Sequence, residues 1–329
     1  MNRPKVVVTQ RIHPEVAGFL GEFSEPVLNE SRDVLPEPEL LARCRDAQGL
    51  MVFMPDRLDA TFLGHCPKLQ IVAATLKGYD NFDVAAMAKR GIAFCIQEDL
   101  LTVATAELAL ALMLGLGRNL LEGDAHIRSG AFQGWRPRFY GIGLAGAQVG
   151  LLGMGQVGQA LAARLKPMGC QVQYCDPRPL TAGEEQELGV TATSFEALLE
   201  GSDYLVLLLP LTPGTRGLLG KDTLDRIKPG CLLINIGRGS VVDEKAVAKS
   251  LNEGHLGGYA ADVFAMEDWA LADRPPSIAA SLLAQGRHTL FTPHLGSAVA
   301  GVRLAIERKA ALQLQAFFAG ETPEGLVQR

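Results

Sequence analysis

Three polar residues follow apolar, strand-like runs in the second half of the chain. Arg238 comes after CLLINI, Glu267 after GGYAADVF, and His294 after TLFTP. Because the carboxyl ends of parallel strands meet at one edge of a sheet, where α/β proteins bind ligands, we expect these side chains to open on one crevice. Together they predict an anion holder, a carboxylate that orients the imidazole, and a general acid or base. Each residue alone is better explained by a loop or packing role, so the prediction rests on the set.

A glycine motif precedes these residues. The stretch VGLLGMGQVGQALAARL carries the spacing G-x-G-x-x-G at Gly153, Gly155 and Gly158. The first glycine permits a tight turn, the second lets the backbone approach a pyrophosphate, and the third lets the helix pack on the strand. A strand pattern precedes the motif and a helical pattern follows it, so the sequence predicts a dinucleotide site.

Asp176 ends the next strand-like run, QVQYC, at a spacing that suits hydrogen bonds to the adenosine ribose. A carboxylate there would repel a 2′-phosphate, so NAD is expected. Arg178 could instead meet that phosphate, which leaves NADP open, and Asp176 could also be a turn residue before Pro177. The other residues expected to contact the dinucleotide are Gln156, Val157, Pro210, Thr215, Asp262 and Thr105.

The elements that must position these residues are short apolar strands alternating with helical patterns, which predict an α/β fold with two doubly wound parallel sheets. Five strands are expected in the first hundred residues (KVVVTQ, EPVLN, LMVFMP, QIVAAT, IAFCI) and six from Gln148 onward (VGLLG, VQYCD, YLVLLLP, CLLINI, GGYAADVF, TLFTPH). The six match a Rossmann domain. One long helix is expected from Thr105 to Gly130, then a loop over FQGWRPRFYGIGLAG. A final amphipathic helix, VRLAIERKAALQLQAFFAG, could return to the first domain.

Composition and charge exclude several classes of protein. The chain of 329 residues has a formal charge of −5, which argues against non-specific binding to nucleic acid or to an anionic membrane. Its six cysteines form no C-x-x-C pair and lie in or beside apolar runs, so we expect buried free thiols in a reducing compartment, and no metal site. The first residues have too short an apolar run for a signal peptide, so a cytoplasmic protein is expected.

This set of motifs resembles the D-2-hydroxyacid dehydrogenase superfamily over essentially the whole chain. The resemblance rests on the glycine fingerprint, NIGRGSVVDEKA, the glutamate after DVF and the histidine of PHLGS. It implies that Arg238 binds the substrate anion, that His294 is the acid or base, and that Glu267 holds and tunes the histidine. It also implies a Rossmann domain (101–298) inserted in a split flavodoxin-like substrate domain (1–100 plus 299–329).

Lys77 stands where a strand-like run, QIVAAT, turns at Gly78. The wider family usually binds a carboxylate at this turn through backbone amides, without a lysine. Lys77, Arg238 and Arg303 would place three cations around one small substrate, which matches a compact dianion better than one carboxylate. Without the surrounding motifs, Lys77 is equally well explained as an exposed charge at a strand end.

Six stretches resemble a specialised branch of the superfamily, the phosphonate (phosphite) dehydrogenases: FMPDR, LKGYDNFD, DLLTVATAELA, FQGWRPRFYG, YAADVFAMEDWALADRP and LFTPHLGSAV. The resemblance implies oxidation of phosphite to phosphate, with water as the oxygen donor and NAD as the hydride acceptor. The substrate-binding residues implied are Lys77, Gly78, Met54, Arg303, Ser297, Trp135 and Tyr140. The two aromatic residues are also consistent with a dimer contact, and a homodimer is expected.

Two other functions fit the same motifs. A D-2-hydroxyacid dehydrogenase would reduce a 2-keto acid with His294 as the acid. A dinucleotide-sensing corepressor would bind NADH on the same scaffold without turnover, and at this net charge it would need a protein partner.

Overall fold

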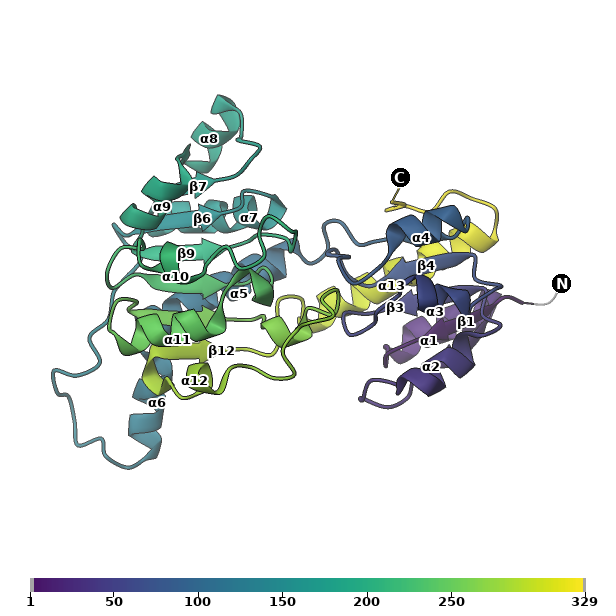
Figure 1. Ribbon diagram of the computed structural model, residues 1–329, viewed down its shortest axis with the longest axis horizontal. Helices are drawn as coiled ribbons and strands as arrows, with labels where there is room; N and C mark the ends of the chain where they lie inside the picture. Colours follow the sequence, from purple (N-terminus) through teal and green to yellow (C-terminus); the bar gives the residue numbers. More distant parts are fainter. Residues whose placement is uncertain (1–2, 328–329) are drawn as a thin grey trace. The chain divides into compact units, whose positions relative to one another are not determined.

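The computed structural model describes residues 3–327, and the chain forms two compact units (Figure 1). Unit 1 comprises the chain up to Leu101, Trp269–Ala272 and the chain from Ala298 onward, and unit 2 comprises Thr102–Asp268 and Asp273–Ser297. Each unit contains one wholly parallel sheet, and helices connect its strands. The expectation of two parallel-sheet α/β domains is therefore confirmed.

Unit 1 has a five-stranded sheet in the order β2-β1-β3-β4-β5. The strands are β1 (Lys5–Val8), β2 (Glu25–Leu28), β3 (Gly49–Val52), β4 (Ile71–Ala74) and β5 (Ala93–Cys95), and the helices are α1 (Pro14–Phe23), α2 (Glu37–Cys44), α3 (Ala60–Gly64), α4 (Val84–Lys89) and α13 (Ala300–Phe318). These strands match the five that the sequence predicts.

Both faces of this sheet are covered, as is usual for parallel sheets. Alternate residues of β4 enter different hydrophobic clusters: Val72 belongs to one, and Ile71 to the other. The second cluster also contains Val16 of α1 and Leu314 of α13. The last helix of the chain thus completes the core of the N-terminal sheet, because its apolar face packs beside α1 on the same side.

Unit 2 has a seven-stranded sheet in the order β12-β11-β10-β9-β6-β7-β8. The strands are β6 (Gln148–Leu152), β7 (Gln171–Cys175), β8 (Val190–Ala192), β9 (Tyr204–Leu207), β10 (Leu232–Asn235), β11 (Gly258–Ala261) and β12 (Thr289–Phe291). Its helices are α5 (Thr102–Gly117), α6 (Leu120–Arg128), α7 (Gln156–Leu165), α8 (Ala182–Leu188), α9 (Phe195–Gly201), α10 (Lys221–Leu224), α11 (Glu244–Asn252) and α12 (Ala280–Leu283).

The prediction of six strands in this unit misses β8, a three-residue edge strand with only one buried residue, Val190. An edge strand this short lacks the apolar run that marks a strand in a sequence. After β8 the chain returns to the other side of β6 to form β9. This reversal of strand order is the point at which doubly wound sheets bind ligands.

The prediction of one helix from Thr105 to Gly130 is wrong. α5 ends at Gly117, Asn119 takes a left-handed conformation (φ 52°), and α6 starts at an angle of 60° to α5. A Cβ atom on Gly117 would lie 2.1 Å from the Tyr204 hydroxyl, and the Gly117 carbonyl accepts a hydrogen bond from the amide of Ile142. These tertiary contacts end the helix where sequence periodicity alone would continue it.

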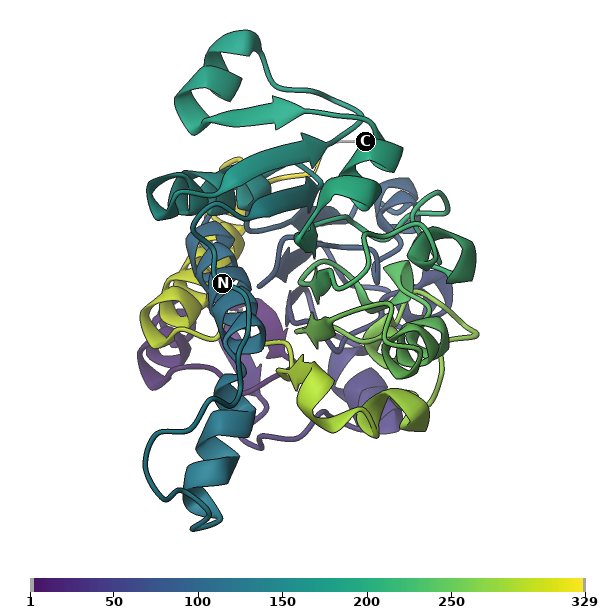
Figure 2. The same ribbon diagram turned by 90° about the vertical axis from the view of Figure 1, so that its left-hand side faces the viewer.

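We call residues 118–142 the arm. It consists of α6 and a loop that, as predicted, contains no helix or strand, and Figure 2 shows it projecting from the rest of unit 2. Within residues 3–327 no single helix combines the length and apolar character needed to cross a membrane, although α5 and α6 would meet both criteria as a bent pair.

Candidate active site

The glycine fingerprint forms the turn between β6 and α7. Gly153 has φ 106°, and a Cβ atom there would lie 3.0 Å from the carbonyl oxygen of Leu208. A Cβ atom on Gly158 would lie 2.6 Å from the Gly153 carbonyl oxygen, whereas one on Gly155 would meet nothing within 4 Å. The first and third glycines are thus required by close packing, and the second leaves open space at the start of α7.

That open space suits a pyrophosphate. Gly155 is the N-cap of α7 without a side-chain cap, and Gln156 and Val157 are the first residues of the helix. Helix N-termini present free amide groups and favour negative charge. The predicted dinucleotide residues of this turn are therefore arranged as a phosphate cradle.

Asp176 follows β7 beside this turn. Its carboxylate accepts hydrogen bonds of 2.8 Å each from the backbone amides of Met154 and Arg178. These bonds hold the carboxylate at the edge of the fingerprint while it stays partly accessible, as a ribose ligand must be, and the Arg178 side chain is exposed.

The loop after β9 holds Pro210 and Thr215 together. The hydroxyl of Thr215 donates to the Pro210 carbonyl oxygen at 2.6 Å and accepts from the amide of Thr212 at 2.9 Å. The two predicted residues are thus neighbours in one braced loop beyond the carboxyl end of β9.

Asp262 is held by several hydrogen bonds within its own unit, and its predicted contact with the dinucleotide stays a prediction. It is 1% exposed, and its carboxylate accepts from the Thr292 hydroxyl (2.6 Å) and from the amides of Leu295 (2.6 Å) and Gly296 (2.9 Å). Burial raises the pKa of this carboxyl. Thr105 joins the same loop, because its hydroxyl donates to the Gly296 carbonyl oxygen at 3.3 Å. Both residues therefore fix the loop that carries His294.

His294 and Glu267 form an oriented pair. The imidazole Nδ1 lies 2.9 Å from Glu267 Oε2, and the other carboxylate oxygen accepts from the amide of Phe264 at 2.8 Å. Because Nδ1 faces a carboxylate, it is the proton-bearing nitrogen, and Nε2 remains for proton exchange with a substrate. His294 has φ 54°, and its own amide donates to the Asp262 carbonyl oxygen. The left-handed backbone and the fixed carboxylate together set the direction of the imidazole.

Arg238 follows β10, which lies beside β11 in the sheet, and β12 is the next strand along. The three strands that precede Arg238, Glu267 and His294 are thus consecutive neighbours. The glycines on both sides of Arg238 allow very close approach: a Cβ atom would lie 2.6 Å from Leu209 O at Gly237 and 1.9 Å from the Phe264 carbonyl carbon at Gly239. The crowding expected from these glycines is present.

Asp268, the residue after Glu267, is not among the predicted site residues. It is 0% exposed, and its carboxylate accepts from the amide of Ser240 at 2.6 Å. It therefore joins the loop of Arg238 to the loop of Glu267. Only the burial separates it from an ordinary surface aspartate.

Unit 1 carries a second set of predicted residues at the carboxyl ends of two adjacent strands. Lys77 and Gly78 follow β4, and Met54 follows β3. Arg303 of α13 donates to the Thr75 carbonyl oxygen at 3.4 Å, and its guanidinium carbon lies 5.7 Å from the centre of the Phe53 ring. Unit 1 thus gathers the lysine, the methionine and the arginine at one edge of its sheet.

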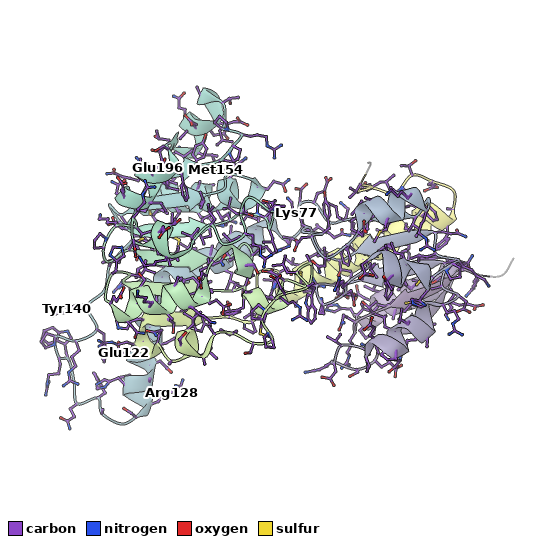
Figure 3. The ribbon with its side chains drawn as sticks, viewed as in Figure 1. Lys77, Glu122, Arg128, Tyr140, Met154 and Glu196 are labelled. Atoms are coloured by element: carbon purple, nitrogen blue, oxygen red, sulfur yellow. The ribbon has the colours of Figure 1, made fainter. Side chains whose placement is uncertain are left out.

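The two cations predicted to bind the substrate in unit 1, Lys77 and Arg303, are partly buried (Figure 3 labels Lys77). Burial lowers the pKa of the Lys77 ammonium, and the acidic groups of Asp99 and Glu98 oppose that shift. Burial likewise lowers the pKa of the Arg303 guanidinium. The Glu307 carboxylate opposes this second shift, so acidic groups offset part of the burial cost of both cations.

Ser297 follows His294 by three residues at the end of unit 2, and the structure leaves its predicted substrate contact as a prediction. Trp135 and Tyr140 are not brought to the site of their own unit. They lie on the arm with 78% and 76% of their surface exposed, and Figure 3 shows Tyr140 at the opposite end of unit 2 from Met154 of the fingerprint. Their exposure fits the alternative interpretation, a contact with a second chain.

Within residues 3–327 no group of three histidine, cysteine, aspartate or glutamate side chains is arranged to hold a metal ion. The six cysteines are all free. Four are buried as expected, whereas Cys170 and Cys175 are partly exposed.

The chain is similar to known proteins over nearly its whole length. Residues 110–296 match the family model described as "D-isomer specific 2-hydroxyacid dehydrogenase, NAD binding domain". The chain is 36% identical to the glyoxylate reductase of Thermococcus litoralis, over 99% of this chain and 97% of that protein. It is also 36% identical to the glyoxylate reductase of Aeropyrum pernix, over 100% of this chain and 97% of the relative.

Two solved structures are similar over nearly the whole chain. A putative D-isomer specific 2-hydroxyacid dehydrogenase from Polaromonas has a TM-score of 0.89 at 28% identity, covering 99% of this chain and 100% of the other. An NADPH-dependent glyoxylate/hydroxypyruvate reductase from Sinorhizobium meliloti, in complex with NADP and malonate, has a TM-score of 0.83 at 30% identity, covering 99% and 97%.

Proposed function

Because the chain belongs to the D-isomer specific 2-hydroxyacid dehydrogenase family and is an NAD-dependent oxidoreductase, we propose that its substrate is phosphite, which it oxidises to phosphate. The family is shown by a match that spans most of unit 2 and by relatives that cover the whole chain. The choice of substrate is the proposal, since members of one fold family act on many different substrates.

One observation carries the choice: Lys77 and Arg303 are two partly buried cations at the same edge of unit 1. A single carboxylate is bound by one bidentate arginine and backbone amides, whereas phosphite near neutral pH carries two negative charges on three oxygens. At an effective dielectric constant near 20, each added cation about 4 Å from a unit charge contributes roughly 4 kcal/mol before desolvation is subtracted. A second cation therefore favours a dianion over a monoanion.

The proposed reaction balances as follows. The hydrogen on phosphorus leaves as hydride with the electron pair of the P–H bond, a P–O bond forms to a water molecule, and that water loses a proton. Phosphorus is oxidised, and bound NAD supplies the hydride acceptor. The chain must therefore hold a dianion, activate water and remove one proton.

Each task has a candidate residue. His294 takes the proton of the attacking water at Nε2, because Glu267 occupies Nδ1. Glu267 also stabilises the imidazolium that forms. Lys77, Arg303 and Arg238 hold the phosphite oxygens and offset the charge that builds up as water adds. Gly78 supplies backbone amide contact, Met54 packs beside the substrate, and Ser297 contributes a hydroxyl.

Reduction of a 2-keto acid such as glyoxylate is the second candidate, and the named relatives favour it. The proteins from Thermococcus litoralis and Aeropyrum pernix are glyoxylate reductases, and the Sinorhizobium meliloti enzyme is a glyoxylate/hydroxypyruvate reductase. In that reaction His294 would donate its proton to the carbonyl oxygen as hydride arrives from NADH.

A direct assay separates the two functions. Purified enzyme is mixed with NAD and either phosphite or a panel of D-2-hydroxy acids, and separately with NADH and glyoxylate, while the absorbance of the reduced nicotinamide is followed. The proposal expects NADH from phosphite with a kcat/KM far above that for every hydroxy acid. Activity on glyoxylate or hydroxy acids alone would replace it, and NADH binding without any turnover would favour the corepressor.

We propose NAD as the preferred cofactor because the fixed Asp176 carboxylate suits ribose hydroxyls and repels a 2′-phosphate. The exposed Arg178 beside it, and the complex of the Sinorhizobium enzyme with NADP, support some use of NADP. The six free cysteines support a reducing compartment such as the cytoplasm.

A homodimer is also part of the proposal. Seven large apolar or aromatic side chains of the arm are exposed: Leu120, Leu121, Ile127, Phe132, Trp135, Tyr140 and Ile142. At the base of the arm, residues from α5 to α6 and residues 286–290, which run into β12, line a cavity of about 290 Å³. An exposed apolar arm beside an apolar cavity on the same chain is self-complementary, which is what a twofold interface requires.

A further inference from the structure

Two loops carry the unit 1 residues that we assign to the substrate. The loop after β3 contains Met54, and the loop after β4 contains Lys77 and Gly78. The strands that lead into these loops, β3 and β4, pair with each other, and their ladder ends at Val52 and Ala74. Beyond it, other contacts must hold the two loops in register.

Asn81 supplies those contacts. Its side-chain amide donates to the Met54 carbonyl oxygen at 2.7 Å and to the Asp56 carbonyl oxygen at 3.2 Å. The backbone carbonyl oxygen of Asn81 accepts from the amide of Leu58 at 3.3 Å, and Leu58 pairs with Phe82 in an isolated parallel bridge. The Asn81 side chain, which belongs to the loop after β4, therefore binds two backbone carbonyl groups of the loop after β3.

The contact is buried, so it is not exchanged readily for water. Asn81 is 4% exposed, and so is Asp56. The carboxylate of Asp56 in turn accepts from the amide of Phe53 at 2.7 Å and from the hydroxyl of Thr9. The residue before Met54 and the carbonyl of Met54 itself are thus both fixed by buried side chains.

Resting on the proposed function, we propose that Asn81 is a positioning residue that sets the placement of Lys77 relative to Met54 and thereby the affinity for the phosphite dianion. Asn81 lies four residues after Lys77 in the same loop. A charged group that must meet a small anion at hydrogen-bond distance loses much of its effect when it is displaced by about 1 Å. Asn81 acts through these neighbours and need not touch the substrate.

The test compares Asn81→Ala with a matched variant, Asn29→Ala. Asn29 is also buried, at 3% exposure, and its side-chain amide also donates to two carbonyl oxygens, those of Thr9 and Asp33, at 3.0 Å each. Both variants lose a buried asparagine that holds two loop carbonyls, so both should lower the Tm by a few degrees. Only Asn81→Ala should raise the phosphite KM, by about tenfold, with the KM for NAD within about twofold of wild type.

A double-mutant cycle with Lys77→Ala identifies the route of the effect. If Asn81 acts by placing the ammonium group, Asn81→Ala should raise KM by less than about twofold once Lys77 is gone. A full tenfold effect in the Lys77→Ala background, or equal KM values for Asn81→Ala and Asn29→Ala, would overturn the inference. Asn81→Ser retains more of the side chain, and its KM should fall between wild type and Asn81→Ala, so it serves if the alanine variant does not fold.

Failure of the proposed function gives a different result. In that case the wild-type enzyme itself would oxidise no phosphite and would reduce glyoxylate. The same variants would then be measured with glyoxylate, where an Asn81→Ala KM equal to that of Asn29→Ala would overturn the positioning role.

Discussion

At the scale of single residues, the chemistry depends on the imidazole of His294, whose orientation is fixed by three features of the structure. Glu267 bonds its Nδ1, the left-handed backbone of His294 aims the ring, and Asp262 fixes the loop on both sides of it. Only one ring nitrogen is then left for the substrate. A general base held in this way can act on one water molecule at one position.

Replacing His294 by alanine should lower kcat by a factor of roughly 10² to 10⁴, the usual contribution of a general base. Binding of NADH, followed by its fluorescence, should not change, because the fingerprint lies on other loops. His65→Ala, at an exposed position of unit 1, is the control and should keep full activity. A His294→Ala rate near that of wild type would reject the role of general base.

Lys77→Ala should raise the phosphite KM by about tenfold or more, because one charge-assisted hydrogen bond to an anion contributes about 1.5–3 kcal/mol. The KM for NAD should stay within about twofold. Lys89→Ala removes the same charge from an exposed position of α4 and should leave both constants unchanged. An unchanged phosphite KM in Lys77→Ala would remove this residue from the site.

At the scale of elements, the loop after β3 depends on a buried carboxyl. Burial raises the pKa of Asp56 to about 6, above the ordinary value near 3.9 for an unfolded chain. The folded state thus favours the protonated group. The protonated Asp56 carboxyl contributes its full stabilisation below about pH 4, and this contribution is lost as the pH rises through about 6. The loss in the free energy of unfolding is at most about 3 kcal/mol.

The Asp56→Asn variant should remove this pH dependence. The difference in unfolding free energy between wild type and Asp56→Asn should change in the variant's favour as the pH rises from 4.5 to 7, and then level off. Urea unfolding followed by circular dichroism at several pH values measures it. A difference that stays constant over this range, or changes in the opposite direction, would contradict the raised pKa.

At the scale of the whole molecule, the arm is the feature on which the proposed homodimer rests. It carries seven exposed large apolar or aromatic side chains, and such concentrations often mark a surface that binds a partner. Trp135 and Tyr140, for which the resemblance implies substrate binding and which are also consistent with a dimer contact, lie on this arm. In the proposed homodimer, contact with the partner would cover them.

Light scattering should therefore give the mass of two 35.2 kDa chains. Ile127→Glu places a charge among the exposed apolar residues of α6 and should shift the protein towards a monomer. Glu187→Gln removes a charge from an exposed position of α8, outside the arm and its cavity, and should leave the dimer intact. A wild-type monomer at micromolar concentration would exclude the assembly.

The sequence by itself determined the fold class, the glycine turn and the strand ends that carry Arg238, Glu267 and His294. These features depend on local patterns: alternating elements, a glycine spacing, and polar residues directly after apolar runs. The tertiary structure alone decided which carboxylates are buried, as Asp268 shows, and where α5 stops, as the contacts of Gly117 show. It alone decided that the Asn81 side chain forms a hydrogen bond with the loop that contains Met54. Burial and contact between distant segments arise only when the chain is packed, so no local pattern of residues encodes them.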